Sequence, residues 1–216
     1  MARLKLGVLI SGRGSNLRSL IAACAKPDYP AEIALVVSNV PGAGGLAFAE
    51  QAGIRHVTIR HKEFPDRAAF DTAVDRELRA AGVELVCLAG FMRIVGTEFL
   101  ERWRDRVVNI HPSLLPSFPG LHVHEQALAA GVKLSGCTVH IVRPAVDDGP
   151  IIVQAAVPVV SDDTPDTLAA RVLEAEHRIY PLAVKLIAEK RVRIEGSRVR
   201  IEDEPAPRAP LLSPAD

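Results

Sequence analysis

The sequence predicts an α/β fold, in which an open, mainly parallel twisted sheet carries helices on both faces. Short β-branched runs alternate with longer stretches whose apolar residues recur at helical spacing. The short runs are almost continuously apolar, as strands covered on both faces are. The 216 residues, 48% hydrophobic and 24% charged, are enough for one sizeable core. We therefore expect one domain over residues 1–202.

The expected elements alternate between strand and helix through the first two thirds of the chain. The strands, each a β-branched apolar run, are Leu4–Ile10, Ile33–Ser38, His56–Ile59, Leu85–Leu88 and Val107–Ile110. The helices, each with apolar residues at helical spacing, are Asn16–Ala25, Gly45–Ala52, Asp66–Ala81, Thr97–Trp103 and His124–Ala130. This alternation is typical of right-handed βαβ units and a parallel sheet.

The last third of the chain departs from this alternation. Two strands, Gly136–Val142 and Ile151–Val157, follow a long loop and should extend the sheet in mixed fashion. One long helix over Thr164–Glu189 follows, with Thr164 as its N-cap and Pro165 at its first position. Residues 191–201 predict a terminal hairpin. Four prolines in the 14 residues of 203–216 predict a disordered tail.

Charge and composition narrow the function classes. The 26 basic and 26 acidic residues balance, so no general attraction to nucleic acid or to an anionic membrane is expected. No apolar run approaches the roughly 18 residues of a membrane-spanning helix, and the start of the chain lacks the pattern of a secretory leader. The three cysteines are odd in number and lack CxxC spacing, which favours reduced thiols. We expect a cytoplasmic monomer or homodimer that acts on small molecules.

A glycine-rich loop, Ser11–Asn16, joins the first strand to the first helix. In such a loop, free backbone amides and the helix dipole bind phosphate. It is not a dinucleotide fingerprint, because Leu17 stands where the third glycine belongs, and no Lys-Ser/Thr pair completes a nucleotide loop. Two interpretations remain open: a cradle for one phosphate at Gly14 and Ser15, or a tight turn in which Ser15 or Asn16 caps the helix.

Two polar side chains, Asn109 and His111, end the apolar run that begins at Val107. Period-two geometry directs both to the same side of the sheet, at the strand end where open α/β sheets bind ligands. A proline-rich turn, Pro112–Gly120, follows and should hold the pair in place. Catalysis and a purely structural histidine both fit this pattern.

A second polar centre is Asp147, in the sequence Asp-Asp-Gly-Pro ahead of an apolar run. A carboxylate beside a histidine orients the ring and favours the imidazolium, although the same four residues suit an ordinary turn. His111, His122 and His124 with Asp147 match no standard zinc spacing, so we expect no metal.

Seven segments together resemble the glycinamide ribonucleotide formyltransferases of purine biosynthesis, which are folate-dependent. The similarity covers roughly residues 4–190, and the order and spacing of the segments make it specific. The segments are Ser11–Leu17, Leu88–Val95, Asn109–Pro116, Gly120–His122, Gly136–His140, Asp147–Ile151 and Glu176–Pro181.

The resemblance implies a Rossmann-like formyltransferase fold and transfer of a formyl group from 10-formyltetrahydrofolate to the amine of glycinamide ribonucleotide. It implies that Gly14, Ser15 and Asn16 hold the ribonucleotide phosphate and that Glu176 contacts the ribose or glycinamide. The implied folate site consists of Arg67, Met92, Arg93, Ile94, Val95 and Asn109, with the backbone of Arg143–Asp147 facing the pterin.

The resemblance also implies that Asn109, His111 and Asp147 are the catalytic set. Asp148 is an acidic neighbour, but the spacing to Gly149 favours Asp147. The Asn109 amide and a protonated His111 would stabilise the oxyanion that forms when the amine attacks. Formyl-folate is then a co-substrate, and no metal is required.

Three alternatives remain. A formyl-folate hydrolase would not need the phosphate cradle, and a formyltransferase for initiator methionyl-tRNA would need a further RNA-binding region. A non-catalytic module that binds sugar phosphates would not need Asn109, His111 and Asp147 together.

Overall fold

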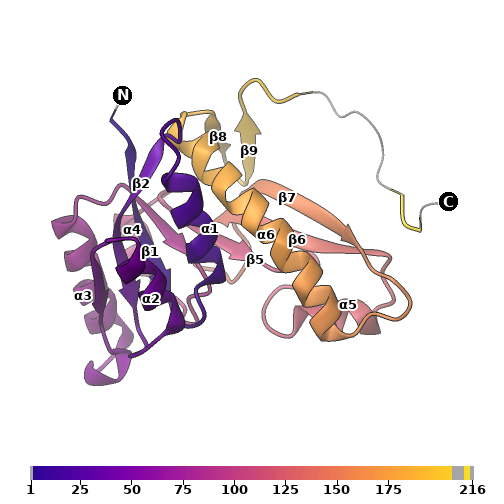
Figure 1. Ribbon diagram of the computed structural model, residues 1–216, viewed down its shortest axis with the longest axis horizontal. Coiled ribbons are helices and arrows are strands. Elements are labelled where there is room, and N and C mark those ends of the chain that lie inside the picture. The colour runs from indigo at the N-terminus through magenta and orange to yellow at the C-terminus, as the bar shows by residue number, and fades with distance from the viewer. Residues whose placement is uncertain (1, 206–211, 215–216) are drawn as a thin grey trace. The chain divides into compact units, whose positions relative to one another are not determined.

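The computed structural model describes residues 2–205 and 212–214, and its chain divides into two compact units (Figure 1). One unit comprises Met1–Asn109 and Ile141–Pro144, and the other Ile110–His140 and Ala145–Asp216. The expectation of one domain over residues 1–202 stays a prediction. The disordered tail predicted for residues 203–216 also stays a prediction. Residues 206–211 and 215–216 are not among the described residues, and the described part of the tail belongs to no helix or strand.

Five parallel strands form the sheet of the first unit in the order β3-β2-β1-β4-β5. Their bounds are β1 Leu4–Ile10, β2 Ala31–Ser38, β3 His56–Thr58, β4 Leu85–Leu88 and β5 Val107–His111. The last four residues of β1 are fully buried or nearly so, which agrees with their unbroken apolar run. The predicted open parallel sheet is therefore confirmed, with element bounds within two residues of those expected.

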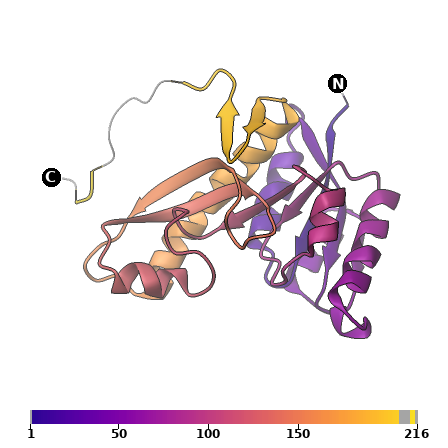
Figure 2. The ribbon, with the colours of Figure 1, turned by 180° about the vertical axis from the view of Figure 1, so that it is seen from behind.

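Helices cover both faces of this sheet, as expected. Helices α1 (Ser15–Cys24) and α2 (Gly44–Gln51) lie on one face, and α3 (Arg67–Ala80) and α4 (Thr97–Arg102) lie on the other (Figures 1 and 2). Right-handed crossovers require this division, because the chain moves outward from β1 to β3 and then returns past β1 to β4 and β5.

The core under α3 and α4 is apolar and aromatic. Phe70, Leu78 and Trp103 are at most 2% exposed and pack against strand residues such as Leu9 and Val86. Burial of a large apolar side chain contributes on the order of 2 kcal/mol each, so this layer holds α3 and α4 on the sheet.

The strand β3 differs from the expectation of full coverage. Its residues His56, Val57 and Thr58 are alternately exposed and half-buried, because β3 is an edge strand that pairs only with β2. A short 3-10 helix, His61–Glu63, follows it and was not predicted.

The second unit contains the remaining elements: α5 Val123–Ala129, β6 Leu134–Ile141, β7 Ile151–Pro158, α6 Pro165–Ala188, β8 Val192–Glu195 and β9 Arg198–Ile201. Strands β6 and β7 are antiparallel, which confirms mixed pairing toward the C-terminus, and β8 and β9 form the predicted hairpin. Helix α6 packs on β7 and α5 packs on α6.

Helix α6 begins as the sequence predicts. Thr164 caps it: the Thr167 amide donates to Thr164 Oγ1 at 3.2 Å, and Thr167 Oγ1 accepts from the Thr164 amide at 2.9 Å. Pro165 occupies the first helical position, where its missing N–H costs nothing. Within the described residues, no helix has both the length and the apolar character to cross a membrane.

Candidate active site

His111 is the last residue of β5, and it is 5% exposed. Its Nδ1 lies 3.4 Å from Oδ2 of Asp147, and its Nε2 lies 3.0 Å from the carbonyl oxygen of Phe118. A carboxylate and a carbonyl both accept hydrogen bonds, and an imidazole satisfies two acceptors only when both its nitrogens carry hydrogen. The surroundings of His111 therefore suit an imidazolium, which can donate a hydrogen bond or a proton.

Asp147 faces more than one donor. Its Oδ2 also accepts the Gly120 amide at 2.9 Å, and its Oδ1 lies 3.8 Å from Nε2 of His140, a 2% exposed side chain of β6. The residue has φ 53°, a left-handed conformation that aspartate tolerates better than most residues. Asp148 is exposed. Of the two neighbouring aspartates, Asp147 and Asp148, it is therefore Asp147 that faces His111.

His140 and Phe118 are neighbours of the pair that the sequence interpretation did not single out. A signal for His140 existed, since Thr138 and His140 stand two residues apart near the end of a buried strand, like Asn109 and His111. No comparable signal existed for Phe118, because its contribution is a backbone carbonyl.

The predicted rigid turn after His111 is tied to the two antiparallel strands. Thr138 Oγ1 donates to the Ser113 carbonyl at 2.7 Å and accepts from the Leu115 amide at 3.1 Å. Ser113 Oγ donates to the Ser117 carbonyl at 2.6 Å, and Gln154 Nε2 donates to the Leu115 carbonyl at 2.9 Å. These bonds are internal to the second unit, and they fix the segment that supplies the Phe118 carbonyl and the Gly120 amide.

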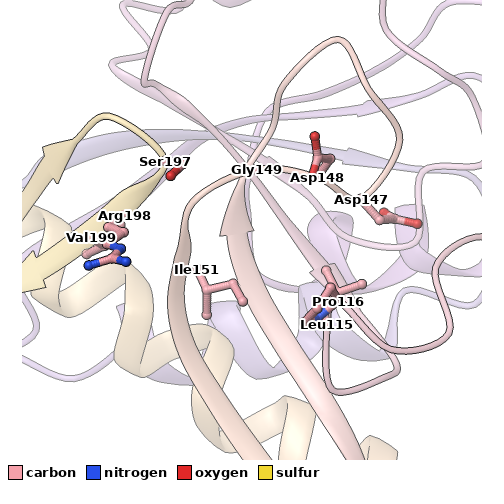
Figure 3. A pocket seen from close by; sticks show the side chains of 9 residues that line it. All are labelled: Leu115, Pro116, Asp147, Asp148, Gly149, Ile151, Ser197, Arg198 and Val199. Carbon is pink, nitrogen blue, oxygen red and sulfur yellow. The ribbon is translucent and has the colours of Figure 1, made fainter.

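A pocket of about 430 Å³ lies beside the Asp147 loop. Figure 3 shows the Asp147–Gly149 loop on one side of it and the turn of the β8–β9 hairpin, Ser197–Val199, on the other. Leu115, Pro116 and Ile151 add apolar lining. Its volume suits a small molecule, but of the residues that the sequence assigned to a site, only Asp147 lines it.

The glycine loop turns tightly into α1 at Gly14. Gly14 is the N-cap of α1 with φ 75°, and no side chain caps the helix, so the alternative in which Ser15 or Asn16 is the cap is wrong. A Cβ on Gly14 would lie 2.4 Å from Cα of Gly45, so no larger residue fits without displacing backbone. Ser15 and Asn16 are the first two residues of the helix. Because a glycine is the N-cap, the N-cap residue offers no side chain to the first amides of α1, and a helix N-terminus of this kind suits a bound anion.

The segment with Met92–Val95 lies close to the glycine loop. The Met92 amide donates to Ser11 Oγ at 2.8 Å, and the Ser11 hydroxyl donates to Oδ1 of Asn39 at 2.6 Å. Met92 and Ile94 are 72% and 56% exposed. Val95 is buried in the core under α3. Exposed apolar side chains beside a polar loop suit the aromatic part of an amphipathic ligand.

Two arginines border the same segment. Arg67 is the first residue of α3, and the guanidinium of Arg93 lies 5.3 Å from the centre of the Phe70 ring. Within the described residues, neither arginine forms an ion pair with a carboxylate, and Nε of Arg93 is buried without a partner. The guanidinium groups of Arg67 and Arg93 can therefore donate hydrogen bonds to an anionic group of a ligand.

Asn109 and Glu176 complete the set. Asn109 is half-buried, two residues before His111 on the same strand and beside Leu88 in the sheet of the first unit. Glu176 is a 6% exposed residue of α6.

Cys137 is a buried thiol of β6. Burial, and secondarily the charge of Glu176, raises the pKa of Cys137 to about 12. Cys137 is therefore a neutral thiol at ordinary pH.

Known proteins resemble the chain along nearly its whole length. Residues 4–184 match the formyl transferase family. A phosphoribosylglycinamide formyltransferase of Haemophilus influenzae is 40% identical over 95% of this chain and 97% of its own length. A crystal structure of glycinamide ribonucleotide transformylase 1 from Symbiobacterium toebii superposes with a TM-score of 0.91 at 50% identity, covering 93% of this chain and 95% of that one.

Some relatives are much longer than this chain. The trifunctional purine biosynthetic protein adenosine-3 of Gallus gallus is 53% identical over 89% of this chain, and the match spans 19% of that protein. The chain therefore corresponds to about a fifth of that relative.

Proposed function

Because the chain belongs to the formyl transferase family, we propose that it formylates N1-(5-phosphoribosyl)glycinamide in de novo purine biosynthesis. The donor is 10-formyltetrahydrofolate, and the products are formylglycinamide ribonucleotide and tetrahydrofolate. The observation that carries the proposal is the buried His111–Asp147 pair at the end of β5. His111 faces two acceptors, the Asp147 carboxylate and the Phe118 carbonyl, and this environment suits an imidazolium.

The chemistry assigns a role to each member of the catalytic set. The amine attacks the formyl carbon and a C–N bond forms, which leaves negative charge on the formyl oxygen. Asn109 and His111 donate to that oxyanion, and Asp147 stabilises the imidazolium. The bond from the carbon to N10 then breaks, the amine loses a proton and N10 gains one. Holding the amine and formyl carbon together supplies much of the remaining acceleration.

The Phe118 carbonyl oxygen lies 3.0 Å from Nε2 of His111, within hydrogen-bond distance. We propose that the formyl oxygen replaces this carbonyl when both substrates bind. The exchange has a small cost, because one acceptor replaces another on the same N–H. Phe118 has φ 54°, in a region that disfavours most side chains, and this suits a carbonyl that gives way.

Most of the residues that we assign to the two substrates belong to the first unit. The ribonucleotide phosphate binds at Gly14, Ser15 and Asn16, where helix amides and the dipole favour an anion. The folate lies along Met92–Val95 and Arg67, where apolar side chains suit its ring system and arginines suit its glutamate carboxylates. Glu176 contacts the ribose or glycinamide, and Asn109 also contacts the folate.

We further propose that the enzyme acts in the cytoplasm on small molecules, as a monomer or homodimer. The balanced charge favours neither nucleic acid nor a membrane surface as a partner. The absence of a metal cofactor stays a prediction.

A formyl-transfer assay tests the function. Purified protein with both substrates should release tetrahydrofolate and formylated ribonucleotide in equal amounts, and glycinamide riboside, which lacks the phosphate, should be a far poorer acceptor. Equal use of both acceptors would overturn the phosphate cradle. Formyl-folate hydrolysis at the same rate without any acceptor would identify a hydrolase instead.

A further inference from the structure

Asp71 is a buried carboxylate that the catalytic proposal does not use. It lies one helical turn after Arg67 on α3 and is 4% exposed. An isolated buried carboxylate is costly, so a carboxylate at such a position is expected to have specific partners. Its hydrogen-bond partner, the Gly96 amide, directly follows the Met92–Val95 segment that would bind folate.

One partner is a backbone amide at the end of the Met92–Val95 segment. Oδ2 of Asp71 accepts the Gly96 amide at 2.7 Å, a short distance typical of a hydrogen bond to an ionised acceptor. Gly96 is the N-cap of α4, so this bond fastens the junction between the segment and the helix to α3. A Cβ on Gly96 would lie 2.9 Å from the same oxygen, which leaves room only for glycine while the carboxylate stays in place.

Arginine charges also act on the Asp71 carboxylate, from beyond ion-pair distance. Burial raises the pKa of Asp71, while the Gly96 amide and then the charges of Arg67, Arg93 and Arg102 lower it. Within residues 2–205, no arginine nitrogen lies within 4.0 Å of this carboxylate. Asp71 therefore attracts Arg67 and Arg93 without using their hydrogen-bond donors, which remain available to an anionic ligand.

We propose that Asp71 is a positioning residue for the folate site: it anchors the end of the Met92–Val95 segment through the Gly96 amide. This inference rests on the proposed function, because it takes the anionic ligand to be the glutamate moiety of formyl-folate. Asp71 touches neither substrate and should act on folate affinity rather than on the chemical step.

Asp71→Ala and Asp71→Asn separate anchoring from general packing. Alanine removes the acceptor, whereas asparagine keeps an oxygen for the Gly96 amide. Loss of a hydrogen bond to a charged group weakens binding by roughly tenfold to a hundredfold. We expect Asp71→Ala to raise the folate Kd and KM by that factor. The ribonucleotide KM and the kcat at saturating folate should stay nearly unchanged, and Asp71→Asn should recover most of the affinity.

Asp75 provides a matched control on the same helix. It is 8% exposed, and its Oδ1 accepts Nε1 of Trp103 at 2.6 Å and pairs with Arg79 at 2.9 Å, away from the folate segment. Asp75→Asn should lower the melting temperature yet leave the folate Kd unchanged. An equal loss of folate affinity in Asp75→Asn would overturn the proposal, because general loosening would then explain the effect of Asp71→Ala.

Gly96→Ala offers a second approach if Asp71→Ala does not fold. The new methyl group pushes against the carboxylate, so this variant should also weaken folate binding. Combined with Asp71→Ala where that variant folds, its effect should be less than additive, since both changes act on one contact. Full additivity, or an Asp71→Asn variant as weak as Asp71→Ala, would contradict the anchor.

The experiment distinguishes failure of this inference from failure of the proposed function. Folate binding to the whole protein is measured by calorimetric titration for wild type, Arg67→Ala, Arg93→Ala and the Asp71 variants. If wild type binds no formyl-folate, or both arginine variants bind it normally, the folate-site assignment fails. If the arginine variants bind weakly and Asp71→Ala binds normally, only the role of Asp71 fails.

Discussion

The glycine loop of the first unit uses backbone groups, whereas the His111–Asp147 pair of the second unit uses side chains. The loop offers backbone amides, and its shape depends on the contact between Gly14 and Gly45, where no side chain fits. The pair offers two polar side chains, an imidazole and a carboxylate, and it depends on the hydrogen-bonded turn that carries Phe118 and Gly120. The loop is therefore sensitive to steric change and the pair to changes of charge. Damage to the loop should lower substrate binding, whereas damage to the pair should lower turnover.

The largest expected effect is that of His111→Ala. Removing a donor to the oxyanion should lower kcat by on the order of 10²-fold or more, with little change in ribonucleotide Kd. Steady-state kinetics and ligand titration measure the two quantities separately. His122→Ala is the matched control, because the His122 side chain is 78% exposed in the same unit. Near-normal kcat in His111→Ala would remove this residue from the mechanism.

Asp147→Asn should be the next most severe change. Asparagine keeps the size of the side chain but loses the carboxylate charge that faces His111. We therefore expect kcat to fall by roughly 10²-fold, the lower limit of the contribution usual for a catalytic acid or base. Asp148→Asn serves as the comparison, since Asp148 is the exposed neighbour, and its kcat should stay close to wild type. Equal losses in the two variants would contradict the assignment of Asp147 as the partner.

Gly14→Val tests the steric half of the comparison. A Cβ at 2.4 Å from Gly45 Cα, together with φ 75°, should cost roughly 1–3 kcal/mol of stability. It should also lower kcat/KM for the phosphorylated acceptor by about tenfold or more, while folate Kd changes little. Gly12→Ala is the steric control, because a Cβ there meets nothing within 4 Å, and its melting temperature should match wild type. A Gly14→Val protein with wild-type stability would show that the loop tolerates a side chain.

The smallest effect should appear in the pH dependence of stability. Burial lowers the pKa of His124 on α5, and the charge of His111 adds to this more weakly than Glu125 opposes it. A histidine with a depressed folded pKa contributes stability above its unfolded pKa of about 6.5, and this is lost as pH falls through the folded value. The melting temperature should therefore drop between pH 7 and pH 5, and His124→Gln should reduce that drop. An identical drop in the variant would remove His124 as its source.

The order of elements was predictable because it depends on local patterns. Apolar runs gave every strand of the parallel sheet, and Thr164 with Pro165 placed the start of α6, since capping involves residues only three apart. The strand β3 was predicted to be covered on both faces, yet it lies at a sheet edge. Edge position depends on the strand order of the whole sheet, which local composition does not contain.

The candidate site was partly predictable for the same reason. Gly14, Ser15 and Asn16 are contiguous, so their common position at a helix start follows from the sequence. His140 was missed because its approach to Asp147 requires β6 and the following loop to fold back. Asp71 was missed as well, because a buried carboxylate on an amphipathic helix looks like any other polar residue until its partner, the Gly96 amide, is known.

Local sequence patterns are enough to predict the fold class, the glycine loop and the polar residues at the end of β5, since each depends on side-chain periodicity or on the conformational freedom of glycine within a few residues. The partners of those residues follow only from the folded arrangement of the chain. The 3.4 Å approach of Asp147 to His111, the Phe118 carbonyl on Nε2 and the bond from Gly96 to Asp71 join residues 7 to 36 positions apart. Contacts at such separations depend on how the elements pack, and packing is a property of the folded chain as a whole.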